Sequence, residues 1–169
     1  MTTEEKKRIN SERQMAVRKA WKREKELVQQ GMGTVNWTEQ QQKELLERGA
    51  VKGYEGQHMK SVSKFPEFAG SVDNIQLLSH EEHLEAHNSG IKKSGYRSPT
   101  NGYYDPQTKI MNDFGDRAPS PPKPMRLKNV YRARNDRYLA RHERSQSSSL
   151  QNSQRRRFYS WIRRGGRIP

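Results

Sequence analysis

Residues 53–90, GYEGQHMKSVSKFPEFAGSVDNIQLLSHEEHLEAHNSG, decide how this chain folds and contain four of its five histidines. Residues 50–62 are β-inclined but interrupted by glycines, so we expect short strands around a bend. NIQLL at 74–78 predicts a further short strand. Ser79 opens a capping box, and Gly90 lies beyond the end of the helix that follows. This order predicts a β-hairpin crossed by one helix, a frame that can hold a single divalent ion between strand and helix.

The predicted helix carries a pair of histidines at a chelating spacing. His83 and His87 are four residues apart, so both imidazoles lie on one face and can bind the same ion. His80 falls on the same side. The spacing alone also fits three polar side chains on a solvated helix. Asn74, at the start of the predicted strand, can brace the preceding loop by bonding to backbone groups.

Composition limits the class of protein. Of 169 residues, 30% are hydrophobic and 31% are charged, with a mean hydropathy of −1.27, which suits one domain with extensions. The chain has no cysteine, so any metal must bind His, Asp, Glu, Asn or Gln. No stretch has membrane-spanning length and the N-terminus lacks an apolar run. We therefore expect no signal peptide, no membrane insertion and a protein that is cytoplasmic when made.

The net charge of +14 is concentrated at the ends of the chain. Residues 31–120 carry ten basic and twelve acidic residues, whereas residues 121–169 carry fourteen basic and two acidic ones. Each phosphate contact of a cationic segment releases counterions, so such ends suit a polyphosphate partner. The alternative is a solubilising tail, although solubility does not need a charge this one-sided.

The last residues, RRRFYSWIRRGGRIP at 155–169, follow a Ser/Gln-rich linker and interleave arginines with aromatic residues. This mixture suits phosphate contacts combined with base stacking. It also suits an anionic membrane surface, which leaves a surface anchor as an alternative. We predict that this tail binds nucleic acid through Arg155, Arg156, Arg157, Arg163, Arg164 and Trp161.

Elsewhere the sequence predicts three helices and a hairpin. Residues 3–30 lack Gly and Pro and are rich in helix formers. Thr38 opens a capping box and Gly49 ends the short helix that it begins. A third helix is expected at 128–143, and residues 102–111 are typical of a turn or hairpin.

The stretch at 53–90 resembles the Gly-His-His (GHH) toxin branch of the HNH nuclease superfamily, which has a ββα-metal fold. The flanks AWKREKELVQQGMGTVNWTEQQQKELLERGAVKGYEG and TNGYYDPQT resemble that branch too, so the resemblance covers roughly residues 18–115. It implies an α+β fold: a small HNH-like core with flanking helices and a partly disordered basic C-terminal extension. We accordingly divide the chain into a basic helix (1–34), the nuclease core (35–115) and the extension (116–169).

The resemblance also implies residue roles. His58 matches the general base that takes a proton from the attacking water, and Asn74 matches the superfamily's middle asparagine. His83 and His87 match the metal-binding histidines of the helix. Gln57 stands where the family usually has histidine, and its neutral amide oxygen is a weak ligand that favours Mg²⁺ over Zn²⁺. We expect one divalent ion, Mg²⁺ first, with Zn²⁺, Ni²⁺ or Mn²⁺ as alternatives.

The function implied is metal-dependent endonuclease cleavage of DNA with little sequence preference. The family further implies a bacterial toxin, exported by a dedicated secretion system and paired with a cognate immunity protein. His80 could supply the ligand missing at Gln57, although its place in the first helical turn favours exposure. If Gln57 has disabled the site, the alternative is a nucleic-acid-binding protein without nuclease activity.

Overall fold

An antiparallel hairpin of two strands, β2 (Tyr54–His58) and β3 (Ile75–Ser79), forms the centre of the fold. The structure is a computed structural model that describes residues 1–91, 95–96 and 98–132. A single strand replaces the pair of short strands predicted around residue 55, because the glycine at the bend, Gly53 with φ +81°, lies before β2. Gly56 continues the ladder opposite Leu77.

Helix α3 (His80–His87) follows β3 directly, as the sequence predicts. The Ser79 Oγ accepts a hydrogen bond from the Glu82 backbone N–H, and the Glu82 carboxylate accepts one from the Ser79 N–H. This reciprocal capping box satisfies two helix-terminal donors and fixes where the helix begins. Because the His80 N–H also donates to the Gly53 carbonyl, the first turn of α3 lies beside the start of β2.

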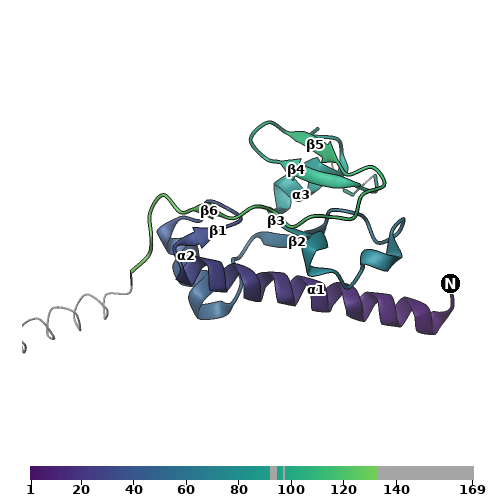
Figure 1. Cartoon of the computed structure of the whole chain (residues 1–169), viewed down its shortest axis with the longest axis horizontal. Helices are drawn as coiled ribbons and strands as arrows, with labels where there is room; N and C mark the ends of the chain where they lie inside the picture. Colours follow the sequence, from purple (N-terminus) through teal and green to yellow (C-terminus); the bar gives the residue numbers. More distant parts are fainter. Residues whose placement is uncertain (92–94, 97, 133–169) are drawn as a thin grey trace, which may run out of the picture. The chain divides into compact units, whose positions relative to one another are not determined.

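The long helix α1 (Thr3–Gln29) packs along the hairpin (Figure 1). Its buried face repeats every four residues, the spacing of a helix with one apolar side. The approach to β2 is close at Gly56, where an added Cβ would lie 2.8 Å from Cγ1 of Val17, so only glycine fits there. The main core that results contains Ala16, Ala20, Val28, Trp37, Leu45, Val51, Ile75, Leu77 and Leu127.

Helix α2 (Glu39–Arg48) begins at the predicted capping box of Thr38, whose side chain accepts from the Gln41 N–H. It ends at Gly49, which has the left-handed conformation that glycine tolerates. Between β2 and β3 the predicted loop contains two short 3₁₀ turns, Pro66–Phe68 and Val72–Asn74. The second turn explains why β3 starts at Ile75, one residue later than predicted.

A second hairpin, β4 (Gly102–Asp105) with β5 (Ile110–Asp113), confirms the hairpin predicted from residue 102 onward. It packs beside α3 through a small cluster of Leu78, Ala86 and Tyr104, with Met111 against it. Figure 1 shows this hairpin next to α3. The β4–β5 hairpin thus covers the side of α3 that faces away from α1.

A third pair of strands joins distant segments: β1 (Met32–Gly33) pairs with β6 (Met125–Arg126). The Leu127 N–H donates to the Gly31 carbonyl at 3.0 Å, which extends the contact. The region predicted as an extension thus contributes a strand to the unit formed by Met1–Val130. Residues 128–132 are not helical, contrary to the helix predicted at 128–143, whose remainder lies outside the described residues.

The fold class is α+β, as predicted: in the described residues, helices combine with three small antiparallel sheets, consistent with a small HNH-like domain. Within the ranges that the structure describes, none of the helices has the length and apolarity that crossing a bilayer requires.

Candidate active site

Three histidines, one of them distant in the sequence from the other two, line one pocket. His58 comes from β2, and His83 and His87 come from α3. The pocket has a volume of about 190 Å³ and is also lined by Arg13 of α1. α3 begins beside the start of β2, because Ser79 pairs with Tyr54, and His83 and His87 lie further along the helix, where they line the pocket together with His58.

His83 is held by a carboxylate that the sequence analysis did not single out. Its Nδ1 lies 2.7 Å from Oε2 of Glu55. A carboxylate can only accept, so Nδ1 is the donor and Nε2 keeps the lone pair that binds metals. Burial lowers the pKa of His83, which outweighs the raising effect of the Glu55 hydrogen bond. The imidazole is therefore neutral near pH 7, the form that coordinates a metal ion.

His87 is oriented in the same way by a backbone carbonyl. Its Nδ1 lies 2.5 Å from the Ser98 oxygen, so Nδ1 donates and Nε2 keeps its lone pair. The rings of His83 and His87 lie 5.2 Å apart between centroids, and the Tyr96 ring is 4.8 Å from that of His83. Among the described residues Nε2 of neither histidine has a hydrogen-bond partner, and the close approach of the two rings agrees with the shared helix face that the spacing of four residues predicts.

Glu55 organises this side of the site. It accepts hydrogen bonds from His83, from His80 at 2.9 Å and from the Tyr96 hydroxyl at 3.0 Å. Partial burial raises the pKa of Glu55, but these hydrogen bonds together outweigh it and hold the pKa below its ordinary value. The signal for Glu55 in the sequence is its position two residues before Gln57, on the same face of a strand beside a histidine-rich helix. Nδ1 of His80 is occupied by its hydrogen bond to this carboxylate.

His58 has the hydrogen bonding of a base. Its Nε2 lies 3.1 Å from the Ala69 carbonyl oxygen, which can only accept, so Nε2 carries the proton and Nδ1 the free lone pair. The residue is 8% exposed. Burial lowers the pKa of His58, the Ala69 bond raises it, and the charges of Arg13 and His83 lower it further, for a net decrease. A neutral imidazole with a free nitrogen can accept a proton at physiological pH.

Gln57 alternates with His58 on β2 and points to the other face of the strand, the face of Glu55. It is 1% exposed, and its Nε2 is 3.4 Å from Oγ1 of Thr100. Its Oε1 is buried and has no hydrogen-bond partner within the part of the chain that the structure describes. Buried acceptors are nearly always satisfied, so this oxygen can accept a hydrogen bond from a water molecule or bind a cation.

The pocket brings together the imidazoles of His83 and His87 as possible ligands, whereas Gln57 is not among the residues that line it. Across residues 1–91, 95–96 and 98–132, no group of three or more His, Asp or Glu side chains is placed to hold a metal. An ion at the helix pair would need the Gln57 amide or water to complete its ligands. The Nε2 atoms of His83 and His87 are the kind of nitrogen that binds a divalent ion, so this pair can supply two of its ligands.

Asn74 braces the loop, as its position predicts. Its Oδ1 accepts from the Lys60 N–H at 2.7 Å, and its Nδ2 donates to the carbonyls of Lys60 at 3.0 Å and Phe68 at 3.3 Å. The side chain is fully buried. These bonds tie both arms of the loop that carries Ala69, the partner of His58. These bonds are those of a positioning residue, and the catalytic role that the resemblance suggests for Asn74 stays a prediction.

The predicted nucleic-acid-binding residues of the tail, Arg155, Arg156, Arg157, Arg163, Arg164 and Trp161, lie outside the described residues.

Comparison with known proteins supports the nuclease resemblance over the first half of the chain. Residues 3–79 match the sequence model of a family described as "GHH signature containing HNH/Endo VII superfamily nuclease toxin". The match confirms the predicted family over this stretch. It includes Gln57, His58 and Asn74 and ends at Ser79, so His83 and His87 follow it.

Several curated relatives are animal proteins. The chain is 44% identical over 81 residues to Teneurin-3 of Mus musculus, 42% over 81 residues to Teneurin-3 of Danio rerio and 40% over 81 residues to Teneurin-4 of Homo sapiens. Each alignment covers 47% of this chain but only 3% of the relative. These relatives give no support to the prediction of a bacterial effector with an immunity protein, which stays a prediction.

Proposed function

We propose that this chain is a divalent-metal-dependent endonuclease that hydrolyses DNA with little sequence preference. The observation that carries the proposal is the pocket in which His58, with a free Nδ1, meets His83 and His87, each with a free Nε2. The match of residues 3–79 to a nuclease family supports it. We propose residues 35–115 as the nuclease core, with residues 1–34 adding Arg13 to the pocket.

In this proposal His83 and His87 would hold the ion, and the unpartnered oxygen of Gln57 would be the third protein ligand. A bound divalent ion supplies charge neutralisation for the phosphate and for the leaving oxygen. Imidazole ligands suit Zn²⁺ and Ni²⁺, whereas the amide oxygen suits Mg²⁺ and Mn²⁺. The preferred metal therefore depends on how strongly Gln57 takes part.

His58 acts as the general base. Its Nδ1 accepts a proton from a water molecule, and the Ala69 carbonyl keeps the ring oriented while the proton moves. The resulting imidazolium is disfavoured by burial and by Arg13, the same causes that lower the pKa of His58. These causes favour release of the proton at neutral pH. Asn74 contributes indirectly, because it fixes the loop to which Ala69 belongs.

Plasmid nicking tests the proposal. Supercoiled DNA is incubated with the full chain and Mg²⁺, Mn²⁺, Ni²⁺ or Zn²⁺, with EDTA as the chelator control and structured RNA as a parallel substrate. We expect nicking that needs a metal and that is lost in His58→Ala. Metal-independent cleavage would contradict the assignment. DNA binding without cleavage under every metal would favour the alternative of a binding protein disabled at Gln57.

The description of the matched family adds a proposal about biological role, namely that the nuclease is toxic to cells. Induced expression should reduce the viability of a bacterial host, and His58→Ala at equal expression should not. Equal toxicity of both proteins would reject a nuclease origin. A cognate immunity protein is the partner that this role implies, and it would abolish nicking when added in stoichiometric amount.

A further inference from the structure

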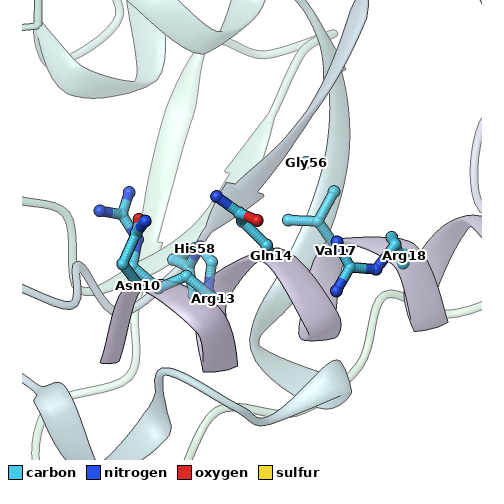
Figure 2. A pocket seen from close by; sticks show the side chains of 7 residues that line it. All are labelled: Asn10, Arg13, Gln14, Val17, Arg18, Gly56 and His58. Atoms are coloured by element: carbon cyan, nitrogen blue, oxygen red, sulfur yellow. The ribbon is translucent and has the colours of Figure 1, made fainter. Parts of the chain in front are cut away.

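A second hollow lies on the other side of His58, between α1 and β2. It has a volume of about 400 Å³. Figure 2 shows its polar wall on α1, with His58 and Gly56 on the strand opposite. The residues that line it are Asn10, Arg13, Gln14, Val17, Arg18, Gly56 and His58.

This α1 groove adjoins the histidine pocket. Arg13, Gly56 and His58 line both hollows. When the scissile phosphate of a DNA strand lies beside His58, the neighbouring part of the same DNA strand would consequently lie at the mouth of the α1 groove.

The two arginines of the groove form no ion pair with the described residues of the protein. Arg8 approaches Glu12 at 4.0 Å and Arg23 pairs with Asp73 at 2.8 Å. In the described part of the chain, neither Arg13 nor Arg18 has an acidic partner within ion-pair distance, and both are exposed. Unpaired guanidinium groups beside a phosphodiester-cleaving site are suited to bidentate phosphate contacts.

The spacing of the polar residues suits a nucleic-acid backbone. Arg13 and Arg18 are five residues apart, about 7.5 Å along the helix axis. A DNA strand carries one phosphate per about 3.4 Å of its axis, so the two arginines span about two phosphate steps. Asn10 and Gln14 lie one turn apart on the same wall and offer amide groups for phosphate or sugar contacts.

We propose that the α1 groove binds the DNA backbone on one side of the scissile phosphate, with Arg13 and Arg18 as phosphate contacts. The inference rests on the proposed function for the position of the scissile phosphate. It assigns to the N-terminal helix a direct role in substrate binding. The binding is electrostatic and independent of base sequence.

Anisotropy titration of the full chain with a labelled DNA duplex in EDTA measures this binding without cleavage. The variants are Arg13→Gln and Arg18→Gln, with Lys19→Gln as the matched control. Lys19 is exposed on the same helix, and it lies nine residues after Asn10, about two and a half turns, so it faces the opposite side. All three substitutions remove one positive charge from α1, and circular dichroism checks that the fold is retained.

We expect each groove variant to weaken binding at least five-fold and to reduce the slope of log K against log salt by about 0.9, whereas Lys19→Gln stays within two-fold of wild type. If Arg18→Gln and Lys19→Gln bind alike, the inference is overturned. The plasmid-nicking assay tests the nuclease proposal separately. If the groove variants bind DNA more weakly but the wild type never cleaves, the nuclease proposal is wrong and the groove proposal stands. If the wild type cleaves but the groove variants bind DNA as it does, the groove proposal is wrong and the nuclease proposal stands.

Discussion

Nδ1 of His83 lies 2.7 Å from Oε2 of Glu55, and this contact decides which ring nitrogen of His83 faces the candidate metal site. The proton must lie on Nδ1, because the carboxylate cannot donate. Nε2 is then left as a ligand, and the negative charge behind the ring increases its basicity. One strand residue thereby sets the chemistry of a helix residue 28 positions later.

Glu55→Gln should weaken metal binding by about 10–100-fold, the usual cost of losing an orienting carboxylate. The neutral amide no longer favours the protonated Nδ1 so strongly. Isothermal titration with Mn²⁺ or Zn²⁺ measures the effect. His80→Ala is the control, because His80 bonds the same carboxylate from an exposed position and should keep affinity within a few-fold. Similar losses of metal affinity in Glu55→Gln and His80→Ala would show that Glu55 acts through the stability of the fold and not through the orientation of His83.

His58→Ala should lose nearly all cleavage and keep metal affinity within a few-fold, because its Nδ1 is assigned to the proton and not to the ion. Nicking rates and metal titrations on the same preparations separate the two effects. Added imidazole should restore part of the activity by supplying the missing base. Cleavage near the wild-type rate would show that another group activates the water.

The double variant His83→Ala, His87→Ala should lose the stabilisation that a divalent ion gives the wild type. Binding to the folded state alone adds about 2.7 kcal/mol at a metal concentration one hundred times Kd. Thermal unfolding with and without Mn²⁺ measures the shift in Tm. An equal rise of Tm in both proteins would move the metal site away from α3.

Gln57→His should tighten transition-metal binding and preserve or raise cleavage, since an imidazole is a stronger ligand than an amide. The side chain is 1% exposed, so the substitution also has to fit a closed space beside Thr100. Gln57→Leu controls for that fit without offering a ligand. Tighter binding with loss of cleavage would show that glutamine is required at this position, and unchanged affinity would exclude contact with the ion.

Glu85→Gln should destabilise the fold at neutral pH and flatten its acid unfolding. The Tyr104 hydroxyl at 2.9 Å and the Lys109 ammonium at 3.1 Å both donate to Glu85, and together they lower its pKa below 4.5. The stabilisation is therefore present above pH 4.5 and is lost as the pH falls through the lowered pKa. We expect a loss of about 1–3 kcal/mol at pH 7 that shrinks toward pH 3.

Denaturant unfolding between pH 3 and 7 measures this loss. Glu47→Gln is the control, because Glu47 is exposed and pairs only with Lys43 at 3.9 Å. A Glu85→Gln penalty that is constant across this pH range would mean that the carboxylate charge is not what stabilises the fold.

Local interactions let the sequence alone determine several elements. The capping boxes at Thr38 and Ser79 and the spacing of His83 and His87 involve residues three or four apart, so their geometry follows from the helix itself. The family resemblance was likewise readable, because Gly56-Gln57-His58 and Asn74 form a local pattern, and the match over residues 3–79 confirms it.

Only the tertiary structure decided which distant side chains share the site. Glu55 acquires a role because β2 lies beside α3, and Arg13 because Gly56 lets α1 approach the strand. The pairing of β1 with β6, residues 32–33 with 125–126, had no signal in either two-residue segment. Tautomers and pKa shifts of His58 and His83 depend on burial and on partners far along the chain, and those are fixed only when the elements pack.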